Sequence, residues 1–180
     1  MYLYKIKGIK VLPKNFKPDG TFDLIRIGKD NDGGYLVDRN SIKKSNGLIS
    51  FGINTDWSFE KSFLKINKVP IHGYDPTIDK VFWFKYLLKA GLSRKHFINP
   101  KKFKNRIYIF MDYFKFWKGE NKIYPEWIGT KTNQTNVSQA ISRMKKIAKP
   151  PYFFSIDIEG SEYDILDELI NNAADIEALV

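Results

Sequence analysis

Apolar residues occur along this chain either in short continuous runs or at helical spacing, and the two patterns predict its elements. The longest run, YFFSIDI at residues 152–158, places apolar side chains on both faces of an extended chain. Such a run is typical of a strand buried between two layers of helices. Gly160 ends it, and Ser161 with Asp164 three residues later predicts a capping box at the start of a helix. Helical spacing then places four apolar residues on one face of that helix: Ile165, Leu166, Leu169 and Ile170.

Shorter apolar runs predict the other strands, and glycine or proline bounds most of them. We expect strands at residues 24–28, 35–37, 48–52, 69–74 and 107–110, and one more that opens at residue 175. The first two flank Asp32-Gly33-Gly34, which is strong hairpin-turn chemistry. Apolar positions at helical spacing predict helices at residues 58–67, 78–90 and 137–147, the second ended by Gly91. Residues 93–106 are expected to form a basic connection, and residues 111–133 a loop or hairpin over the sheet edge.

This alternation of strands and helices indicates an α/β fold with a mostly parallel sheet and helices on both faces. We expect one domain over residues 24–180, preceded by a basic N-terminal lead-in at residues 1–23. The last predicted strand has hardly begun where the sequence ends, so we expect the sheet to be truncated on its C-terminal side.

Composition excludes several classes of site. The 180 residues contain no cysteine, so there is no disulfide, thiolate metal site or cysteine nucleophile. This fits a reducing interior, and we expect a cytoplasmic protein without a signal peptide or membrane span. His72 and His96 are too distant in sequence for a local metal motif, so no transition-metal site is expected. The sequence does not indicate the oligomeric state.

The net charge of +10 is unevenly distributed. Residues 155–180 contain eight acids and no Lys or Arg, so the other 154 residues hold 30 basic and 12 acidic groups, a net +18. Such a field attracts anionic partners. The plainer interpretation is a Lys-rich solvated surface, and nucleic acid is the least favoured partner.

Three predicted strands end in residues that could bind a ligand or take part in catalysis. The carboxyl ends of parallel strands meet at one edge of a sheet, where α/β proteins bind ligands. Gly52 ends one strand, and Asp75 follows 23 positions later, near the spacing of an acid that binds ribose hydroxyls. Asp157 and Glu159 end the run at residues 152–158. Purely structural roles remain open for all of them: turn formation, helix capping and ion pairing.

Two segments carry a family resemblance. Residues 156–166, IDIEGSEYDIL, match the pattern I-D-x-E-G-x-E-x-x-x-L. This resembles the hallmark of FkbM-type methyltransferases, which depend on S-adenosylmethionine (SAM). Residues 50–60, SFGINTDWSFE, resemble the cofactor loop of one branch of that family, and RIG at 26–28 with DGGY at 32–35 is similar to its N-terminal hairpin. The resemblance covers residues 24–180 and is loose between residues 78 and 134.

The resemblance implies a Rossmann-like methyltransferase sheet with a SAM site. Gly52 would let the backbone approach the methionine moiety, with Asn54 and Asp56 lining that loop. Glu60 would be the acid that the family's loop uses at the helix start, and Asp75 would hold the ribose.

Asp157 and Glu159 would then be the catalytic residues, facing the methyl group and the acceptor, and either could serve as general base. The resemblance implies O-methylation of a sugar, glycan or secondary metabolite, and the basic charge hints at an anionic acceptor. Glu162 lies in the first helical turn, where the helix dipole stabilises an acid, so we interpret it as structural. Methyl transfer assisted by Mg²⁺, held by carboxylates, is a further mechanism that remains open.

Two other functions remain open, and a third alternative is a folded fragment without activity. An NAD(P)-dependent enzyme could use a similar sheet, but Gly52 lacks the partner glycines of the dinucleotide fingerprint. A basic nucleic-acid-binding module without catalysis would leave the acids at the strand ends unexplained.

Overall fold

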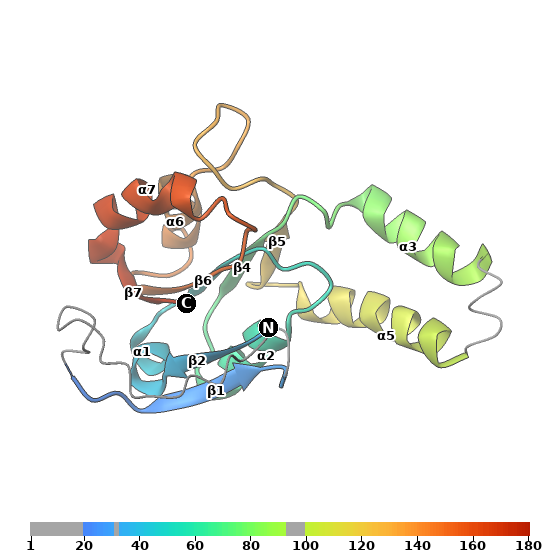
Figure 1. The fold of residues 1–180 in the computed structure, drawn as a ribbon, viewed down its shortest axis with the longest axis horizontal. Helices are drawn as coiled ribbons and strands as arrows, with labels where there is room; N and C mark the ends of the chain where they lie inside the picture. The colour runs from blue at the N-terminus through green and yellow to red at the C-terminus, as the bar shows by residue number, and fades with distance from the viewer. Residues whose placement is uncertain (1–19, 31–32, 93–99) are drawn as a thin grey trace, which may run out of the picture.

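A computed structural model describes residues 20–30, 33–92 and 100–180, and Figure 1 shows the chain coloured from its N-terminus to its C-terminus. Most of the predicted lead-in at residues 1–23 therefore lies outside the described residues. The same holds for Asp32 of the predicted hairpin turn and for residues 93–99 of the predicted basic connection.

A five-stranded parallel sheet forms the centre of the molecule. Its strands are β3 (Leu48–Phe51), β4 (Ile71–Tyr74), β5 (Lys122–Tyr124), β6 (Tyr152–Ile156) and β7 (Ile176–Leu179). They are arranged in the order β5-β4-β3-β6-β7, and every neighbouring pair is parallel. The predicted α/β class is confirmed. The chain moves from β3 outward to β5 and then returns to the other side of β3, which is the strand order of Rossmann-like sheets, with its switch point between β3 and β6.

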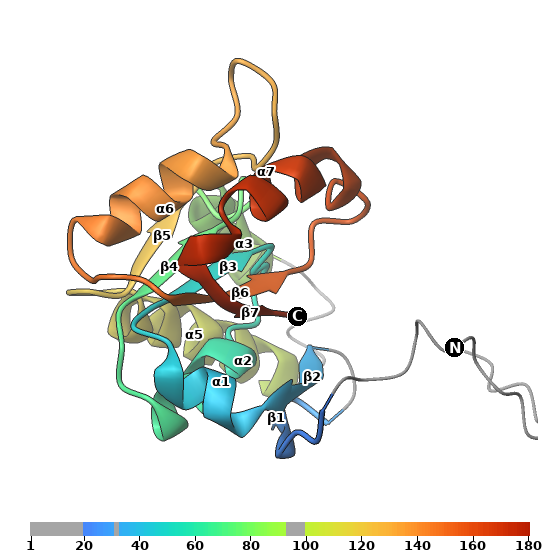
Figure 2. The same cartoon turned by 90° about the vertical axis from the view of Figure 1, so that its left-hand side faces the viewer.

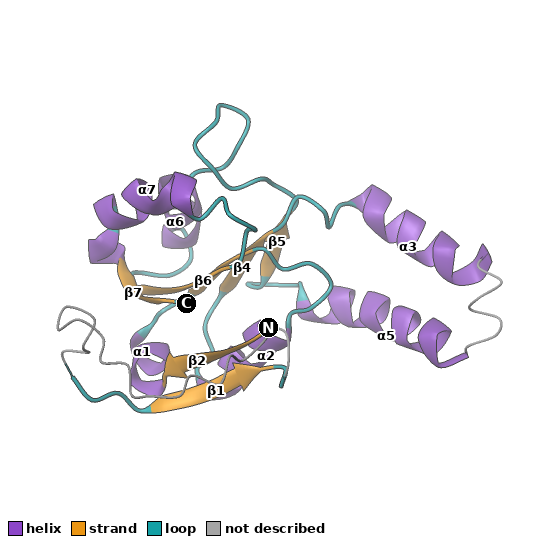
Figure 3. Cartoon of the chain, in the orientation of Figure 1, coloured by secondary structure: helices purple, strands orange, loops and turns teal. Residues whose placement is uncertain are grey.

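Helices cover both faces of this sheet. Helices α6 (Val137–Lys145) and α7 (Leu166–Asn171) lie on one face, and α1 (Arg39–Lys44) and α2 (Ser58–Ile66) lie on the other (Figures 2 and 3). The predicted hairpin, β1 (Leu24–Gly28) paired antiparallel with β2 (Gly34–Asp38), packs outside α2. Helix α1 was not predicted, although its N-cap Asp38 accepts a hydrogen bond from the Ser41 N–H at 2.8 Å. No helix within the described part of the chain is long and apolar enough to cross a membrane.

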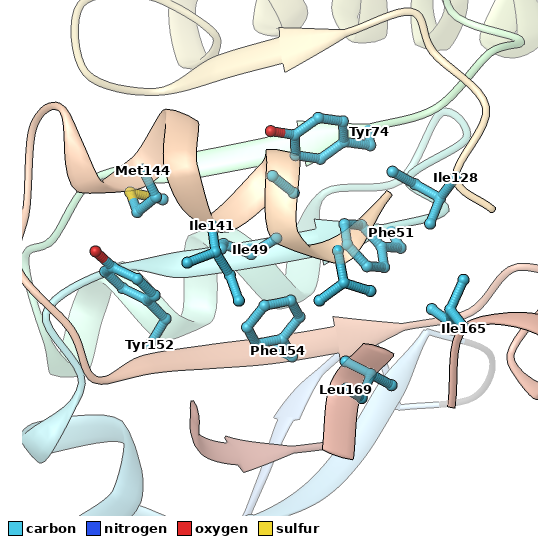
Figure 4. Close-up of a cluster of buried hydrophobic side chains, with 12 residues drawn as sticks. Ile49, Phe51, Tyr74, Ile128, Ile141, Met144, Tyr152, Phe154, Ile165 and Leu169 are labelled. Atoms are coloured by element: carbon cyan, nitrogen blue, oxygen red, sulfur yellow. The ribbon is translucent and has the colours of Figure 1, made fainter. Parts of the chain in front are cut away.

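Alternate residues of the central strands fill two separate cores. Figure 4 shows the core under α6 and α7, where Ile49 and Phe154 of the strands lie against Ile141 of α6. On the opposite face, Leu48 and Phe153 pack with side chains of α2 and the hairpin. Both faces of β3 and β6 are thus apolar, which explains why these strands are continuous apolar runs in the sequence.

The prediction of a strand at residues 107–110 is wrong, because these residues lie inside the long helix α5 (Pro100–Phe116). The apolar side chains that pack inward come from residues 109, 110, 113 and 116, a helical spacing. A short apolar run alone does not distinguish a buried strand from a helix segment. Residues 100–106, expected in the basic connection, begin this helix. The edge strand is β5, inside the segment predicted as loop or hairpin.

The predicted capping box at Ser161 and Asp164 does not form. The Asp164 N–H donates instead to the backbone carbonyl of Ser161 at 3.1 Å. A short 3-10 turn (Tyr163–Ile165) leads into α7, and neither element has a side-chain cap.

This 3-10 turn also changes which residues of the segment are buried. Ile165 and Leu169 are buried as predicted, whereas Leu166 and Ile170 are exposed. Tighter winding in the turn alters the angular spacing between neighbours, so one continuous α-helical face does not hold across the junction.

Candidate functional site

A cavity of about 830 Å³ lies at the carboxyl edge of the sheet, where loops from β3, β4 and β6 meet the β1–β2 hairpin. This is the edge, next to the switch point, where open α/β sheets bind ligands. The cavity lining includes all seven residues that the sequence singled out: Gly52, Asn54, Asp56, Glu60, Asp75, Asp157 and Glu159. The structure therefore brings the predicted site together in one place.

Gly52 permits the close approach of the β3 and β6 loops. Its φ is +80°, and an added Cβ would lie 1.8 Å from the backbone oxygen of Asp157. The Asp157 N–H donates to the carbonyl of Phe51 at 2.9 Å, so the two strands remain paired up to this point. Any residue other than glycine would force the loops apart or strain the backbone.

Asp75 holds the loop that follows Gly52. One carboxylate oxygen accepts the N–H groups of Ile53 and Asn54 at 2.9 and 2.6 Å. The other accepts the N–H and the hydroxyl of Thr77 at 2.7 and 2.5 Å. Each carboxylate oxygen accepts about two hydrogen bonds, so these four donors use its capacity. The predicted contact of Asp75 with a ribose stays a prediction, and the first task of this carboxylate is to shape the loop.

The same loop contains a residue in the left-handed region. Asn54 has a φ of +49°, a conformation that Asn adopts more readily than most residues. Its side-chain oxygen accepts the N–H of Thr55 at 2.8 Å, which stabilises the turn locally. The loop is therefore fixed by its own hydrogen bonds before any ligand arrives.

Glu60 is a buried carboxyl group at the wall of the cavity. Its side chain is only 3% exposed, and its Oε2 has no hydrogen-bond partner among the described residues. Burial raises the pKa of Glu60 to about 7, although hydrogen bonding from its own backbone and from the Ser50 side chain acts to lower it. A buried acceptor atom without a donor is costly, so Oε2 is available to a donor on a ligand in the cavity.

The hairpin closes one side of the cavity through two contacts. Lys29 forms an ion pair with Asp56 at 2.5 Å, and the Tyr35 hydroxyl donates to Asp157 at 2.9 Å. The Tyr35 ring also packs edge-on against Phe59, 5.7 Å between centroids. Sequence reasoning had noted the hairpin but missed both Lys29 and Tyr35. The tyrosine of the DGGY segment was the available signal.

The loop after β6 presents the two predicted catalytic acids. Glu159 has a φ of +55°, its side chain is exposed, and no donor among the described residues reaches its carboxylate. Glu162 accepts the N–H of Ile158 at 2.9 Å, in line with its interpretation as a structural residue. Its partial burial acts to raise the pKa of Glu162, but hydrogen bonds from the loop backbone outweigh that and lower it. Glu162 thus stabilises the turn that contains Glu159.

The cavity is strongly acidic although the protein is basic. Its lining contains six carboxyl groups and one lysine. Such a lining favours a cationic ligand or one rich in hydroxyl groups, and it repels the phosphates of a dinucleotide. Within the described residues, no group of three or more His, Asp or Glu side chains could hold a metal ion.

His72 lies away from this site, inside the sheet on β4. It is 1% exposed and stacks edge-on against Tyr124. Burial, followed by the nearby charges of Lys122 and Arg143, lowers the pKa of His72 to about 4. It is a neutral core residue at ordinary pH.

Comparisons with models of known protein families, with curated proteins and with solved structures found no match to this chain.

Proposed function

We propose that this chain is a SAM-dependent methyltransferase that acts on a hydroxyl group of a sugar, glycan or secondary metabolite. The observation that carries the proposal is the acidic cavity at the switch point of a Rossmann-like sheet, with Oε2 of the buried Glu60 in its wall and no donor to that atom among the described residues. The resemblance of residues 50–60 and 156–166 to FkbM-type enzymes supports it.

The residues present fit SAM in charge. SAM carries a sulfonium, an ammonium and a carboxylate, so it is a net cation, and an acidic lining attracts it. Glu60 is suited to accept from the ammonium group, because a buried carboxylate with a free oxygen gains most from a charged donor. Gly52 lets the loop after β6 approach the loop after β3, so that Asp157 and residues 53–56 line one cavity. A dinucleotide would bring two phosphates into the same acidic space.

In this reaction SAM supplies a methyl group activated by the positive sulfur. The leaving thioether needs no proton, so alignment of the reactants supplies most of the barrier reduction, about 7–11 kcal/mol in favourable cases. We assign Glu159 as the general base that takes the acceptor's hydroxyl proton, because no described residue competes for its carboxylate. Asp157, which accepts a hydrogen bond from the Tyr35 hydroxyl, orients the acceptor.

Binding tests the proposal first. Isothermal calorimetry with SAM, with its demethylated product and with NAD should show binding of the first two and none of NAD. Glu60→Gln should weaken SAM at least about tenfold, since a charge-assisted hydrogen bond contributes about 1.5–3 kcal/mol. Glu120→Gln, an exposed glutamate outside the cavity, serves as the matched control. Binding of NAD in preference to SAM would remove the methyltransferase assignment.

Turnover tests the catalytic roles. Acceptors are screened with SAM labelled on its methyl group against panels of sugars, glycans and small hydroxyl compounds. Glu159→Gln should then lower kcat by about 10²–10⁴-fold, the usual contribution of a general base, with SAM affinity unchanged. Asp157→Asn should mainly raise the KM of the acceptor. If neither variant changes turnover, the acids of this loop are not catalytic.

A further inference from the structure

Two helices form an arm that projects from the sheet. Helices α3 (Lys80–Leu92) and α5 lie side by side and extend away from the other layers (Figure 1). Aromatic contacts join them, including Trp83 with Phe110 and Tyr113 at 5.7 and 4.5 Å between ring centroids. Helix α3 continues through Gly91, where the sequence predicted its end. We call this pair of helices, residues 80–92 and 100–116, the arm.

The outer surface of the arm is unusually apolar. Seven large apolar side chains on it are between 40% and 66% exposed, namely Val81, Phe84, Leu88, Phe103, Tyr108, Met111 and Phe114. Single exposed apolar residues are ordinary on protein surfaces, but several on one side of a helix indicate an interaction site. On α3 the exposed apolar residues recur at i, i+3 and i+7, and therefore form one stripe.

Helix α5 has three distinct sides. One side faces α2, where Asp112 accepts the indole N–H of Trp57 at 2.8 Å and pairs with Lys61. A second side faces α3 through Phe110 and its neighbours. The third side points outward and holds the exposed residues 103, 111 and 114, at i, i+8 and i+11, with the half-buried residue 107 between them.

The arm is also the most basic part of the described chain. Its 30 residues contain eight Lys and Arg and one acid, so they carry +7 of the total charge of +10. The single acid, Asp112, is turned inward and paired, as described above. Lys104 and Lys115 are exposed beside the outward apolar side chains of α5, as is Lys85 beside those of α3.

We propose that the outer face of the arm docks on the surface of an anionic lipid bilayer. Helices with apolar side chains bordered by lysines bind at the interface, because the apolar groups enter the acyl boundary while the lysines attract acidic headgroups. The aliphatic residues Val81, Leu88 and Met111 favour lipid over nucleic acid, since they neither stack on bases nor contact phosphate. A second copy of the arm would bring two strongly positive surfaces together, which disfavours self-association.

Vesicle binding tests this inference and does not depend on the methyltransferase assignment. The protein should co-sediment with vesicles of phosphatidylcholine and phosphatidylserine, but not with phosphatidylcholine alone. Binding should weaken as salt rises, since charge attraction at the surface is screened. Lys104→Glu with Lys115→Glu should reduce the partition coefficient roughly twentyfold or more, at about fivefold per lost lysine. Lys65→Glu with Lys131→Glu makes the same charge change at exposed sites outside the arm and should have a smaller effect.

The apolar contribution is tested separately. Met111→Ser with Phe114→Ser should reduce binding at least tenfold, whereas Leu166→Ser with Ile170→Ser, on the similarly exposed surface of α7, should leave it unchanged. Circular dichroism checks that the variants remain folded.

Two results would overturn the inference. One is equal binding to neutral and anionic vesicles, or none to either. The other is tight binding to a single-stranded oligonucleotide that Met111→Ser with Phe114→Ser leaves intact, which would make the arm a nucleic-acid surface.

Discussion

At the residue scale, Glu60 combines a cost in stability with a proposed role in binding. Its pKa is about 7 in the folded protein, against an ordinary value of 4.5. Between these pH values the folded state holds more protons than the unfolded state, so stability falls as pH rises from about 4.5 to 7. Glu60→Gln removes this titration. We expect the variant to exceed the native protein in free energy of unfolding by about 1–3 kcal/mol at pH 8, and by little near pH 5.

Urea unfolding at several pH values measures this difference. Glu120→Gln, at an exposed site, should follow the native pH profile. The same protonation affects binding, because an ammonium group prefers the carboxylate form of Glu60. SAM affinity should therefore rise as pH increases through about 7 in the native protein and stay flat in Glu60→Gln. A native affinity independent of pH would mean that Glu60 does not contact the ligand.

Asp75 gives a second prediction, which separates shaping of the loop from direct binding. Asp75→Asn replaces an acceptor with an amide N–H₂ that faces the N–H groups of the loop or Thr77. We expect a loss of about 1–3 kcal/mol in stability and weaker SAM binding. Amide hydrogen exchange at Ile53 and Asn54 should accelerate. Asp79→Asn is the control, because Asp79 caps α3 and Asn is an equally good cap.

Unchanged exchange at Ile53 and Asn54, together with weaker binding, would instead assign Asp75 to the ribose. The sequence placed Asp75 at the correct edge because the ends of parallel strands converge. It did not reveal that this side chain turns back to the loop, since that depends on how the backbone after Gly52 folds.

At the element scale, the β1–β2 hairpin closes one side of the cavity through two side-chain contacts. Lys29→Ala with Tyr35→Phe deletes the ion pair to Asp56 and the hydrogen bond to Asp157. We expect faster SAM dissociation and an increase of about three- to tenfold in Kd, because an exposed ion pair contributes up to about 1 kcal/mol and a typical hydrogen bond about 0.5–1.5 kcal/mol. Stopped-flow fluorescence measures the rates. Lys43→Ala with Tyr108→Phe is the matched control at exposed positions, and equal effects of the two doubles would contradict a closing role.

Elements with two buried faces were the ones that the sequence predicted well. The strands β3 and β6 are apolar on both sides and therefore produce unbroken runs. Residues 107–110 produce the same local pattern from a helix, because α5 packs one side on the body and exposes apolar residues on another. Only tertiary packing distinguishes the two cases, and Tyr108, the exposed residue of this segment, belongs to the surface that we propose contacts lipid.

At the scale of the whole molecule, the net charge of +10 combines an acidic cavity with a basic arm. The sequence predicted that a basic field would attract an anionic partner, but it could not assign the charges to places. The fold gathers six carboxyl groups around the cavity and concentrates lysines on the arm. A cationic ligand and an anionic docking surface are therefore compatible in one chain.

These two surfaces are connected through Asp112, which joins the arm to the residue that precedes α2. Its carboxylate accepts the indole N–H of Trp57 and pairs with Lys61, and it is 15% exposed. Asp112→Ala leaves a buried N–H and a partly buried ammonium without an acceptor, so we expect a loss of about 1–3 kcal/mol in stability. Because Trp57 directly follows the loop at residues 52–56, SAM affinity should fall as well.

Hydrogen exchange by mass spectrometry locates this effect. Peptides from α5 and from residues 52–60 should both exchange faster in Asp112→Ala, while those from α6 should not change. Asp164→Ala, at an exposed site near α7, should match the native protein. Faster exchange confined to α5, with SAM affinity intact, would show that the arm moves independently of the cavity. Faster exchange in both regions, with weaker SAM binding, would mean that α5 and the cavity loop are energetically coupled through Trp57 and Asp112.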